Sequence, residues 1–280
     1  MNIAEIADGL RWDPSGLWCA ETRDAISYPS DQSSFCFQLE DSSFWFRHRN
    51  RCIGELAERF LEPGAVLFDV GGGNGTVAAT LTERGVDVWL VEPSRPAVEN
   101  ARSRGLRNLI CGSFAGCRFR EGVLPNVGLF DVVEHLPDDG AFLRDVARAI
   151  VDGGRLLVSV PAYPSLWSSY DVRIGHYRRY TRRSLTERIK AAGFDVEYVT
   201  YLFAPFVAGV FLFRALPDRI GLRRREPCRR ARQELLPLGA RFNRMLVALL
   251  RPEAVAVRRL RRVPFGTSCL AVARKRPRRS

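Results

Sequence analysis

The stretch 66-VLFDVGGGNGT-76 constrains this chain more than any other part of its sequence. An apolar run ends in the acid Asp69, and four glycines follow between positions 71 and 75. A strand that runs through such a turn into a helix brings backbone N–H groups close to whatever binds there. The pattern predicts a strand–turn–helix unit that holds a nucleotide-like cofactor. A tight turn that binds nothing is the alternative.

Short apolar runs alternate with helical patterns along most of the chain, which predicts a doubly wound α/β sheet with helices on both faces. The expected strands are 65–70, 87–93, 107–112, 126–132, 155–161, 194–203 and 266–274. The expected helices are 44–60, one that opens near 76, 94–104, 139–150 and 181–193. Asp152, Gly153 and Gly154 predict a turn before the fifth strand, and Thr181 or Ser184 is the expected cap of the last helix.

The length suits one large domain that carries an insertion. We expect four segments: 1–61, an N-terminal helical segment and pre-sheet helix; 62–200, the cofactor-binding core; 201–264, a helical cap inserted before the last strand; and 265–280, the last strand with a basic tail. The apolar part of the cap, 203–213, is expected either to be buried or to line an entrance for an apolar substrate.

The net charge of +12 comes almost wholly from arginine, which clusters at 222–232, 258–262 and 274–280. Such clusters can bind nucleic acid or an anionic membrane surface, but a solvated surface is the favoured interpretation. The longest apolar run, 201–213, is too short to span a membrane, and the first residues have no signal-peptide pattern. We therefore expect a cytoplasmic protein of unknown oligomeric state.

The kind of cofactor follows from the residues around the turn. A dinucleotide fingerprint requires a third glycine where this chain has Thr76. Asp69 would repel a pyrophosphate, whereas the sulfonium and amino group of S-adenosylmethionine (SAM) tolerate a carboxylate. Glu92 ends the next strand, 21 residues after Gly71, where an acid can accept hydrogen bonds from both ribose hydroxyls. The sequence thus favours SAM over NAD(P)H.

These features resemble the class I SAM-dependent methyltransferases, in particular their bacterial small-molecule group. The resemblance rests on FDVGGGNG, LVEPS, 129-LFDVVEHLPDD-139, VSVP and the AGF before the sixth strand. It implies a seven-stranded, mostly parallel sheet whose antiparallel last strand lies between strands five and six.

The resemblance also implies roles for single residues. The cofactor would contact Asp69, Gly71, Gly73, Asn74, Glu92, Phe130 and Asp131. Many members place an aspartate after the third strand to bind adenine, and here Ser113 offers a weaker acceptor. Arg49, one turn after Trp45 in a similar pre-sheet helix, would bind the SAM carboxylate, with a solvated arginine as the alternative.

Methyl transfer to a hydroxyl needs a base, and the chain has three histidines. His135 and His176 follow the fourth and fifth strands, at the edge where α/β proteins bind ligands, so both are candidate catalytic residues. His48 lies in the pre-sheet helix and is not expected to act. A reaction without a side-chain base, in which His135 only orients a loop, stays open.

The loop after the fifth strand is the expected acceptor site. Trp167, Tyr170, Tyr177 and Tyr180 would form its wall, and Arg178 or Arg179 would pair with an acidic group. We expect no metal, because the cysteines form no C-x-x-C pair and Asp138 and Asp139 start a helix.

The predicted function is methyl transfer to a small-molecule acceptor, foremost at oxygen, in bacterial secondary or cell-surface metabolism. The alternatives are methylation of nucleic acid or of a lipid-like substrate, and a protein that binds SAM without methyl transfer.

Overall fold

The computed structural model describes residues 2–22, 37, 39–221 and 239–277. Its strands are β1 (Leu10–Asp13), β2 (Leu17–Ala20), β3 (Val66–Val70), β4 (Asp87–Glu92), β5 (Leu109–Cys111), β6 (Leu124–Phe130), β7 (Ile150–Pro161), β8 (Phe194–Leu202) and β9 (Ser268–Lys275). Its helices of seven or more residues are α3 (Phe44–Phe60), α4 (Thr76–Thr82), α5 (Arg95–Ser103), α7 (Asp139–Ala149), α9 (Arg182–Ala191), α13 (Gly239–Leu249) and α14 (Arg251–Arg258). Shorter helices are α1 (Ile3–Ile6), α6 (Phe114–Cys117), α8 (Ser169–Arg173), α10 (Val207–Val210) and α11 (Leu216–Arg219). The arginine cluster 222–232 lies outside the described residues.

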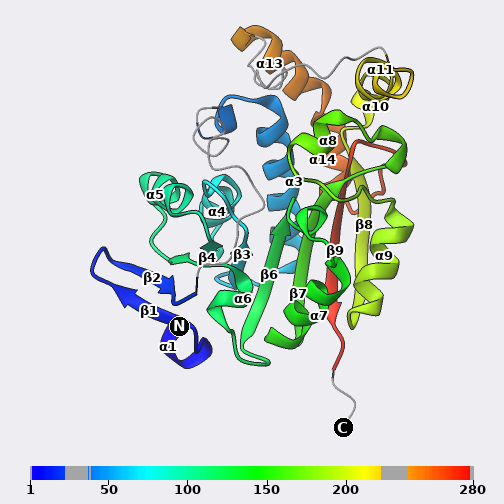
Figure 1. Ribbon diagram of the computed structural model, residues 1–280. Helices are drawn as coiled ribbons and strands as arrows, with labels where there is room; N and C mark the ends of the chain where they lie inside the picture. The colour runs from blue at the N-terminus through cyan, green and yellow to red at the C-terminus, as the bar shows by residue number, and fades with distance from the viewer. Residues whose placement is uncertain (1, 23–36, 38, 222–238, 278–280) are drawn as a thin grey trace.

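The strands form one sheet in the order β1-β2-β5-β4-β3-β6-β7-β9-β8 (Figure 1). From β5 to β7 neighbouring strands are parallel, and β9 runs antiparallel between β7 and β8. The predicted mostly parallel sheet with an antiparallel last strand between the fifth and sixth core strands is thereby confirmed.

The predicted number of seven strands is wrong, because an N-terminal hairpin extends the sheet to nine. β1 and β2 pair antiparallel, and β2 continues the sheet beside β5. The turn carries Gly16 at φ 78°, and Trp12 packs edge-on against Trp18 with ring centroids 5.4 Å apart. The prediction of a helical N-terminal segment is corrected here, since strands of four residues are too short to show a clear alternation.

The turn predicted at 152–154 is also corrected, because β7 runs through it. Strand β7 pairs with β6 at Leu124–Ile150 and again from Asn126–Arg155, with an irregular register between them. The Arg155 N–H donates to the Asn126 side chain at 3.1 Å, so a side chain replaces one bond of the ladder. Gly153, at φ 79°, lets the strand bulge instead of ending.

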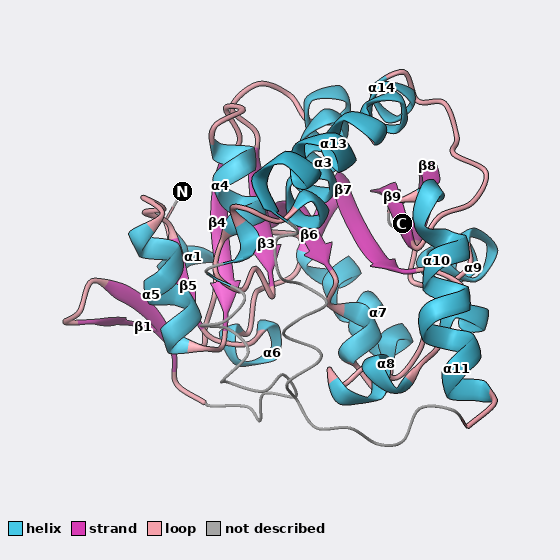
Figure 2. Ribbon diagram, turned by 90° about the horizontal axis from the view of Figure 1, so that it is seen from above, coloured by secondary structure: helices cyan, strands magenta, loops and turns pink. Residues whose placement is uncertain are grey.

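Helices pack on both faces of the sheet, which makes three layers (Figure 2). Successive residues of a strand point to opposite faces: Phe68 joins the core beneath α7 and α9, whereas Leu67 joins the core beneath α3 and α4. Helix α9 is capped by a capping box in which Thr181 and Ser184 each bind the other's backbone N–H. Both residues predicted as alternative caps therefore take part.

The end of β8 is joined to α3 and α14 by a buried carboxylate. Glu253 of α14 accepts from the backbone N–H groups of Phe203 and Ala204 at 2.6 and 2.9 Å, and contacts His48 Nε2 at 2.7 Å. The Phe203 ring stacks on Trp45 with centroids 3.8 Å apart. Of the apolar stretch 203–213, Phe203 is thus buried, whereas Leu212 and Phe213 are exposed. No helix among the described residues is both long and apolar enough to cross a bilayer.

Two left-handed glycines of the 71–75 turn differ in the space around them. A Cβ on Gly75 would lie 2.7 Å from Leu106 Cδ1 and 2.8 Å from Ala101 Cβ, whereas a Cβ on Gly73 would meet nothing within 4 Å. Gly75 has φ 78° and Gly73 has φ 55°, so alanine is strained at both. Gly75 therefore lets the start of α4 pack closely against Ala101 and Leu106, whereas a side chain at Gly73 would meet no neighbour.

We predict that Gly75→Ala destabilises the protein more than Gly73→Ala. Both changes should lower the free energy of unfolding by about 1–2 kcal/mol through backbone strain. Gly75→Ala should add about 1–3 kcal/mol from overpacking. Urea unfolding of the two variants measures the difference, and equal losses would contradict the close packing at Gly75.

Candidate functional site

The candidate site lies at the edge where the parallel strands end, beside the N-terminal half of α3. Parallel α/β sheets bind ligands at this edge, because the loops after the strands and the N-termini of the following helices meet there. The glycine turn after β3, Glu92 at the end of β4 and the segments after β6 and β7 are the parts that this fold brings together.

Glu92 holds the glycine turn against β4. Its Oε2 accepts from the Gly73 N–H at 3.0 Å, and its Oε1 accepts from the Ser94 N–H at 2.8 Å. Burial raises the pKa of Glu92, and the two backbone donors oppose that rise. The predicted ribose ligand is therefore a buried carboxylate that is already fixed in place, and its contact with ribose stays a prediction.

The Asp69 carboxyl group lies beneath the turn and is 1% exposed. Neither of its oxygens has a hydrogen-bond partner among the described residues; the Ala78 N–H of α4 is close enough to favour ionisation but is not in hydrogen-bonding geometry. A Cβ on Gly72 would lie 2.8 Å from Asp69 Oδ2, so only glycine leaves room there. Burial raises the pKa of Asp69 to about 7, and the charge of Arg49 opposes that rise.

Arg49 and Asp131 form a partly buried ion pair that joins α3 to the end of β6. Arg49 Nη1 donates to Asp131 Oδ2, and the Ser159 hydroxyl donates to Asp131 Oδ1 at 3.0 Å. Asp131 has φ 60°, which ends β6 earlier than the predicted 126–132. Arg49 is 8% exposed, so the alternative of a solvated arginine is wrong. Its contact with the SAM carboxylate stays a prediction.

Four other predicted cofactor residues have structural roles of their own. The Asn74 side chain donates to Glu40 at 3.0 Å and accepts from Asn100 at 2.9 Å. The Ser113 hydroxyl accepts from the Gly116 N–H at 2.9 Å and caps α6. Phe130 is buried in the core on the α3 face, and Gly71 is in the left-handed region at φ 72°. Contacts of these residues with a cofactor stay predictions.

The two histidines predicted as bases lie together, although 41 positions separate them. The rings of His135 and His176 meet edge to face with centroids 4.7 Å apart. His176 Nδ1 lies 2.9 Å from Asp171 Oδ1, and its Nε2 lies 3.8 Å from Glu134 Oε1. Arg179 binds both oxygens of Asp171, at 2.7 and 3.1 Å. His48 is elsewhere, bound to Glu253.

Burial sets the protonation of this cluster. Burial, together with the charge of the neighbouring His176, lowers the pKa of His135 to about 4, which keeps His135 neutral near pH 7. Burial also raises the pKa of Glu134 well above its ordinary value, and the charge of Asp131 adds to that effect. For Asp171, by contrast, the hydrogen bond with His176 and the charge of Arg179 outweigh burial and lower the pKa.

The residues predicted to line the acceptor site differ in their burial and in their contacts. Tyr170 and Trp167 are partly buried, and Arg214 lies over the Tyr170 ring at 4.4 Å. Tyr177 is 54% exposed. Arg178 binds Asp139 at 2.8 Å and the Pro137 carbonyl at 2.6 Å. The prediction that Arg178 or Arg179 pairs with an acidic acceptor is therefore not supported, because both guanidinium groups already bind carboxylates of this chain.

Glu134 and Asp171 are site residues that the sequence did not single out. Glu134 stood in the quoted 129–139 segment, but nothing in its sequence position shows that the fold buries it beside His176. Asp171 precedes His176 by five positions, a spacing that belongs to no recognised motif. Only the tertiary structure shows these contacts.

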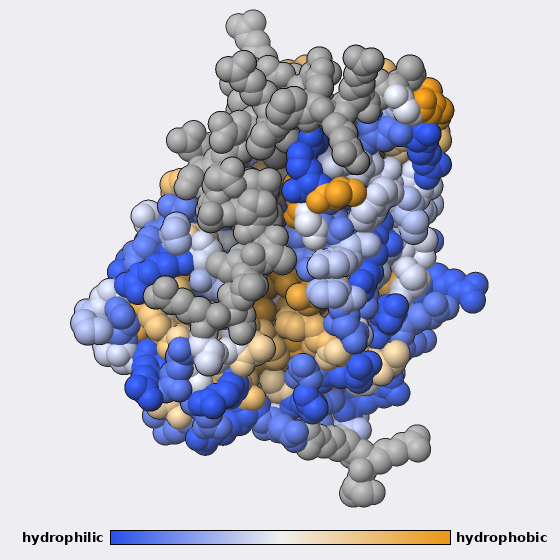
Figure 3. Space-filling view, in the orientation of Figure 1, coloured by the Kyte–Doolittle hydropathy of each residue, from blue (hydrophilic) through white to orange (hydrophobic). Residues whose placement is uncertain are grey.

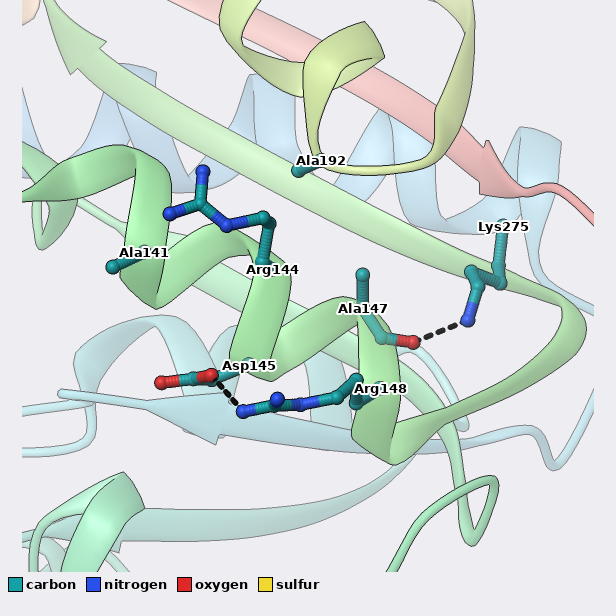
Figure 4. Close-up of a pocket in the computed structure, with 7 residues that line it drawn as sticks. All are labelled: Ala141, Arg144, Asp145, Ala147, Arg148, Ala192 and Lys275. Carbon is teal, nitrogen blue, oxygen red and sulfur yellow. Dashed lines mark hydrogen bonds and ion pairs between the residues drawn. The ribbon is translucent and has the colours of Figure 1, made fainter.

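A separate surface hollow of about 490 Å³ lies far from these residues. It is lined by α7, Ala192 and Lys275, and Lys275 donates to the Ala147 carbonyl there (Figure 4). Because β9 is antiparallel to β7, its end at Lys275 lies at the opposite edge of the sheet from the candidate site. This hollow is therefore not part of the site.

Comparison with known proteins identifies the family. A family model described as a methyltransferase domain matches residues 44–199, which is more than half of the 280 residues. A probable S-adenosylmethionine-dependent methyltransferase of Mycolicibacterium smegmatis is 28% identical over 162 residues, 57% of this chain and 62% of that protein. A ubiquinone biosynthesis O-methyltransferase of Xanthomonas oryzae is 29% identical over 102 residues, 34% of this chain and 43% of that protein. The chain thus spans less than two thirds of these relatives.

Solved structures share the fold. The partner of the Haloferax volcanii Trm112 methyltransferase activator has a TM-score of 0.56 at 17% identity, with 90% of this chain and 96% of that chain covered. Phosphoethanolamine N-methyltransferase 2 of Haemonchus contortus, in complex with S-adenosyl-L-methionine, has a TM-score of 0.55 at 18% identity, with 91% of this chain and 59% of that chain covered. At these identities the likeness shows the fold alone.

We predict that Asp69→Asn stabilises the ligand-free protein at pH 8 but not at pH 4. The folded-state pKa of Asp69, about 7, lies above its ordinary value of 3.8, so the native state keeps a proton that the unfolded chain loses. The stability of the natural protein therefore falls as the pH rises between these values. The gain for Asp69→Asn should be on the order of 4 kcal/mol at pH 8.

Urea unfolding of the natural protein and of Asp69→Asn at both pH values measures this effect. A variant that is less stable at pH 8 would show that Asp69 is stabilised by contacts that outweigh its burial.

Proposed function

The chain belongs to the methyltransferase-domain family, and on that premise we propose that it transfers a methyl group from SAM to an oxygen of a small-molecule acceptor. The observation that carries the cofactor part is the pair of buried carboxylates at the ends of neighbouring strands, Asp69 and Glu92, on either side of the glycine turn. The predicted place in secondary or cell-surface metabolism and in the cytoplasm belongs to this proposal and stays a prediction.

The residues at this edge suit SAM by charge and by hydrogen bonding. SAM supplies a methyl group on a positively charged sulfur, and its amino acid part adds an ammonium and a carboxylate. The Asp69 carboxylate, which lacks a hydrogen-bond partner among the described residues, suits the cationic parts. The Arg49 guanidinium suits the carboxylate, and Glu92 has lone pairs left for ribose hydroxyls after it binds the turn.

An oxygen acceptor is supported by the histidine cluster and by the distant O-methyltransferase relatives. A hydroxyl must lose its proton as the new bond to carbon forms. His176 has the arrangement of a general base, because its Nδ1–H donates to Asp171 and leaves the Nε2 lone pair directed away from that carboxylate. The orientation of His176 is further fixed by Arg179, which holds Asp171.

The acceptor is expected to have apolar character. Hydrophobic surface gathers near the centre of the face seen in Figure 3, with hydrophilic surface around it. Leu212 and Phe213, between α10 and α11, are 51% and 75% exposed, which supports a lipid-like acceptor as the second candidate. Methylation of nucleic acid stays a further candidate, and the arginine cluster 222–232 lies outside the described residues.

We predict that SAM stabilises the protein and that Glu92→Gln weakens this effect. At a SAM concentration about 100 times its dissociation constant, binding adds about 2.7 kcal/mol. In Glu92→Gln the loss of charged hydrogen bonds should raise the dissociation constant by about tenfold or more. Thermal unfolding over a range of SAM concentrations measures both. Glu99→Gln on α5, whose side chain is 43% exposed, is the matched control.

NADPH should give no comparable stabilisation. Protection by NADPH but not by SAM would overturn the cofactor assignment, and equal SAM affinity of Glu92→Gln and Glu99→Gln would overturn the role of Glu92.

We predict that His176→Gln lowers kcat without changing SAM affinity. Loss of a positioned base costs roughly 10²–10⁴-fold in rate. The measurement is formation of S-adenosylhomocysteine with a panel of phenols, hydroxy acids and amines as acceptors. Turnover of amines alone, with His176→Gln as active as the natural protein, would contradict the proposal of an oxygen acceptor. SAM binding without turnover of any acceptor would instead support a SAM-binding protein that transfers no methyl group.

A further inference from the structure

We propose that Glu134, His135 and His176 form a binding site for a divalent first-row transition-metal ion. Each of the three side chains offers a ligand atom, and these atoms lie within 4.8 Å of one another. Two imidazoles with one carboxylate are a donor set that binds such ions in proteins and leaves coordination positions open. The proposal departs from the expectation of no metal, which considered only the cysteine spacing and the Asp138–Asp139 pair.

The distance between His176 and Glu134 suits a bridging ion. His176 Nε2 and Glu134 Oε1 are 3.8 Å apart, which is too long for a hydrogen bond. Two coordination bonds of about 2.1 Å span up to about 4.2 Å, and in a tetrahedral site the ligand atoms lie about 3.4 Å apart. A small closure of the three side chains would therefore complete the site.

The Glu134 carboxyl group is the second, independent observation. Its side chain is 1% exposed, and neither oxygen has a hydrogen-bond partner among the described residues. Its own backbone N–H is close enough to favour ionisation but is not in hydrogen-bonding geometry. A buried carboxylate without a partner is costly, and native proteins retain one where an ion or a ligand satisfies it. The two histidine rings are in contact with each other, and a nitrogen of each lies within 4.8 Å of a Glu134 oxygen.

Asp171 and Arg179 give His176 the arrangement of a metal ligand. Histidines that bind metals usually donate their other ring N–H to a carboxylate, which fixes the tautomer and the orientation of the ring. His176 Nδ1 lies 2.9 Å from Asp171 Oδ1, and Arg179 holds both oxygens of Asp171. With that proton on Nδ1, the Nε2 atom has a lone pair that faces the Glu134 oxygen. A metal ion between these two atoms would bind both of them.

The site would deepen the proposed function, on which this part of the inference rests. A bound ion lowers the pKa of a hydroxyl that coordinates it, so an acceptor hydroxyl could lose its proton to solvent and attack the methyl carbon as an oxyanion. The carbon–sulfur bond then breaks, and its electron pair stays on sulfur. The Nε2 lone pair cannot bind a metal and act as a base at once, so metal binding assigns His176 to one of these roles.

The test is a metal titration of the full chain after treatment with a chelator and its removal. Zn²⁺ is titrated by calorimetry, and Co²⁺ by the visible absorption bands that report nitrogen and oxygen ligands. We expect one ion per chain. Glu134→Gln and His176→Gln should each lower the affinity by more than the roughly 10–100-fold typical for loss of a supporting residue. His48→Gln, which removes a buried histidine bound to Glu253, is the matched control with unchanged metal affinity.

Asp171→Asn tests the positioning of His176. It keeps all three ligands, so it should weaken binding by about 10–100-fold and shift the Co²⁺ absorption bands. A purely structural role of Asp171 would leave those bands unchanged.

Three outcomes would overturn the metal proposal: a folded natural protein that binds neither ion, a Glu134→Gln variant that binds with natural affinity, or equal loss of binding in His48→Gln. SAM-induced stabilisation of the chelator-treated protein is measured in parallel. SAM binding without metal binding refutes only the metal site, and metal binding without SAM binding refutes only the proposed function.

Discussion

The candidate site depends on buried acidic charge at the ends of the strands and on the single guanidinium that joins it, Arg49. Asp69, Glu92, Asp131 and Glu134 are brought to one edge of the sheet because β3, β4 and β6 are parallel. Arg49 binds Asp131 directly. Burial raises the pKa of both Asp69 and Glu134, and the charge of Arg49 opposes that rise. Asp69, Glu92 and Glu134 are buried acids with a raised pKa, so the edge is suited to ligands that bring positive charge. SAM and a divalent metal ion both do so.

The position of Arg49 is set by packing far from the charges. Helix α3 lies against α4 and α14, with Cys52, Ile53 and Leu56 fully buried. Glu253 joins α14 to His48 of α3 and to the backbone at the end of β8. The helical part of 201–264 thus supports the site through α3, the same helix that carries Arg49. A cap that only covered the acceptor would not need these contacts.

Much of the core could be predicted from local pattern. Apolar runs of strand length predicted the parallel strands, and the antiparallel last strand followed from the resemblance to a known family. The hairpin at 10–20 was missed because its strands have four residues each, too few to show a clear alternation of apolar and polar residues. The bulge at Gly153 was predicted as a turn because a glycine with positive φ is compatible with a turn and with a β-bulge.

The sequence by itself determined the cofactor-binding unit, since Asp69, the glycine turn and Glu92 lie within one strand–turn–helix–strand segment whose geometry is local. It also named His135 and His176 as the residues to consider. Only the tertiary structure decided what surrounds them. The loop after β7 brings His176, Asp171 and Arg179 back to Glu134 at the end of β6, and no periodicity in the sequence encodes that contact. The physical reason is that strand and turn signals act over a few residues, whereas the burial and charge of a site arise from segments that are distant in the chain.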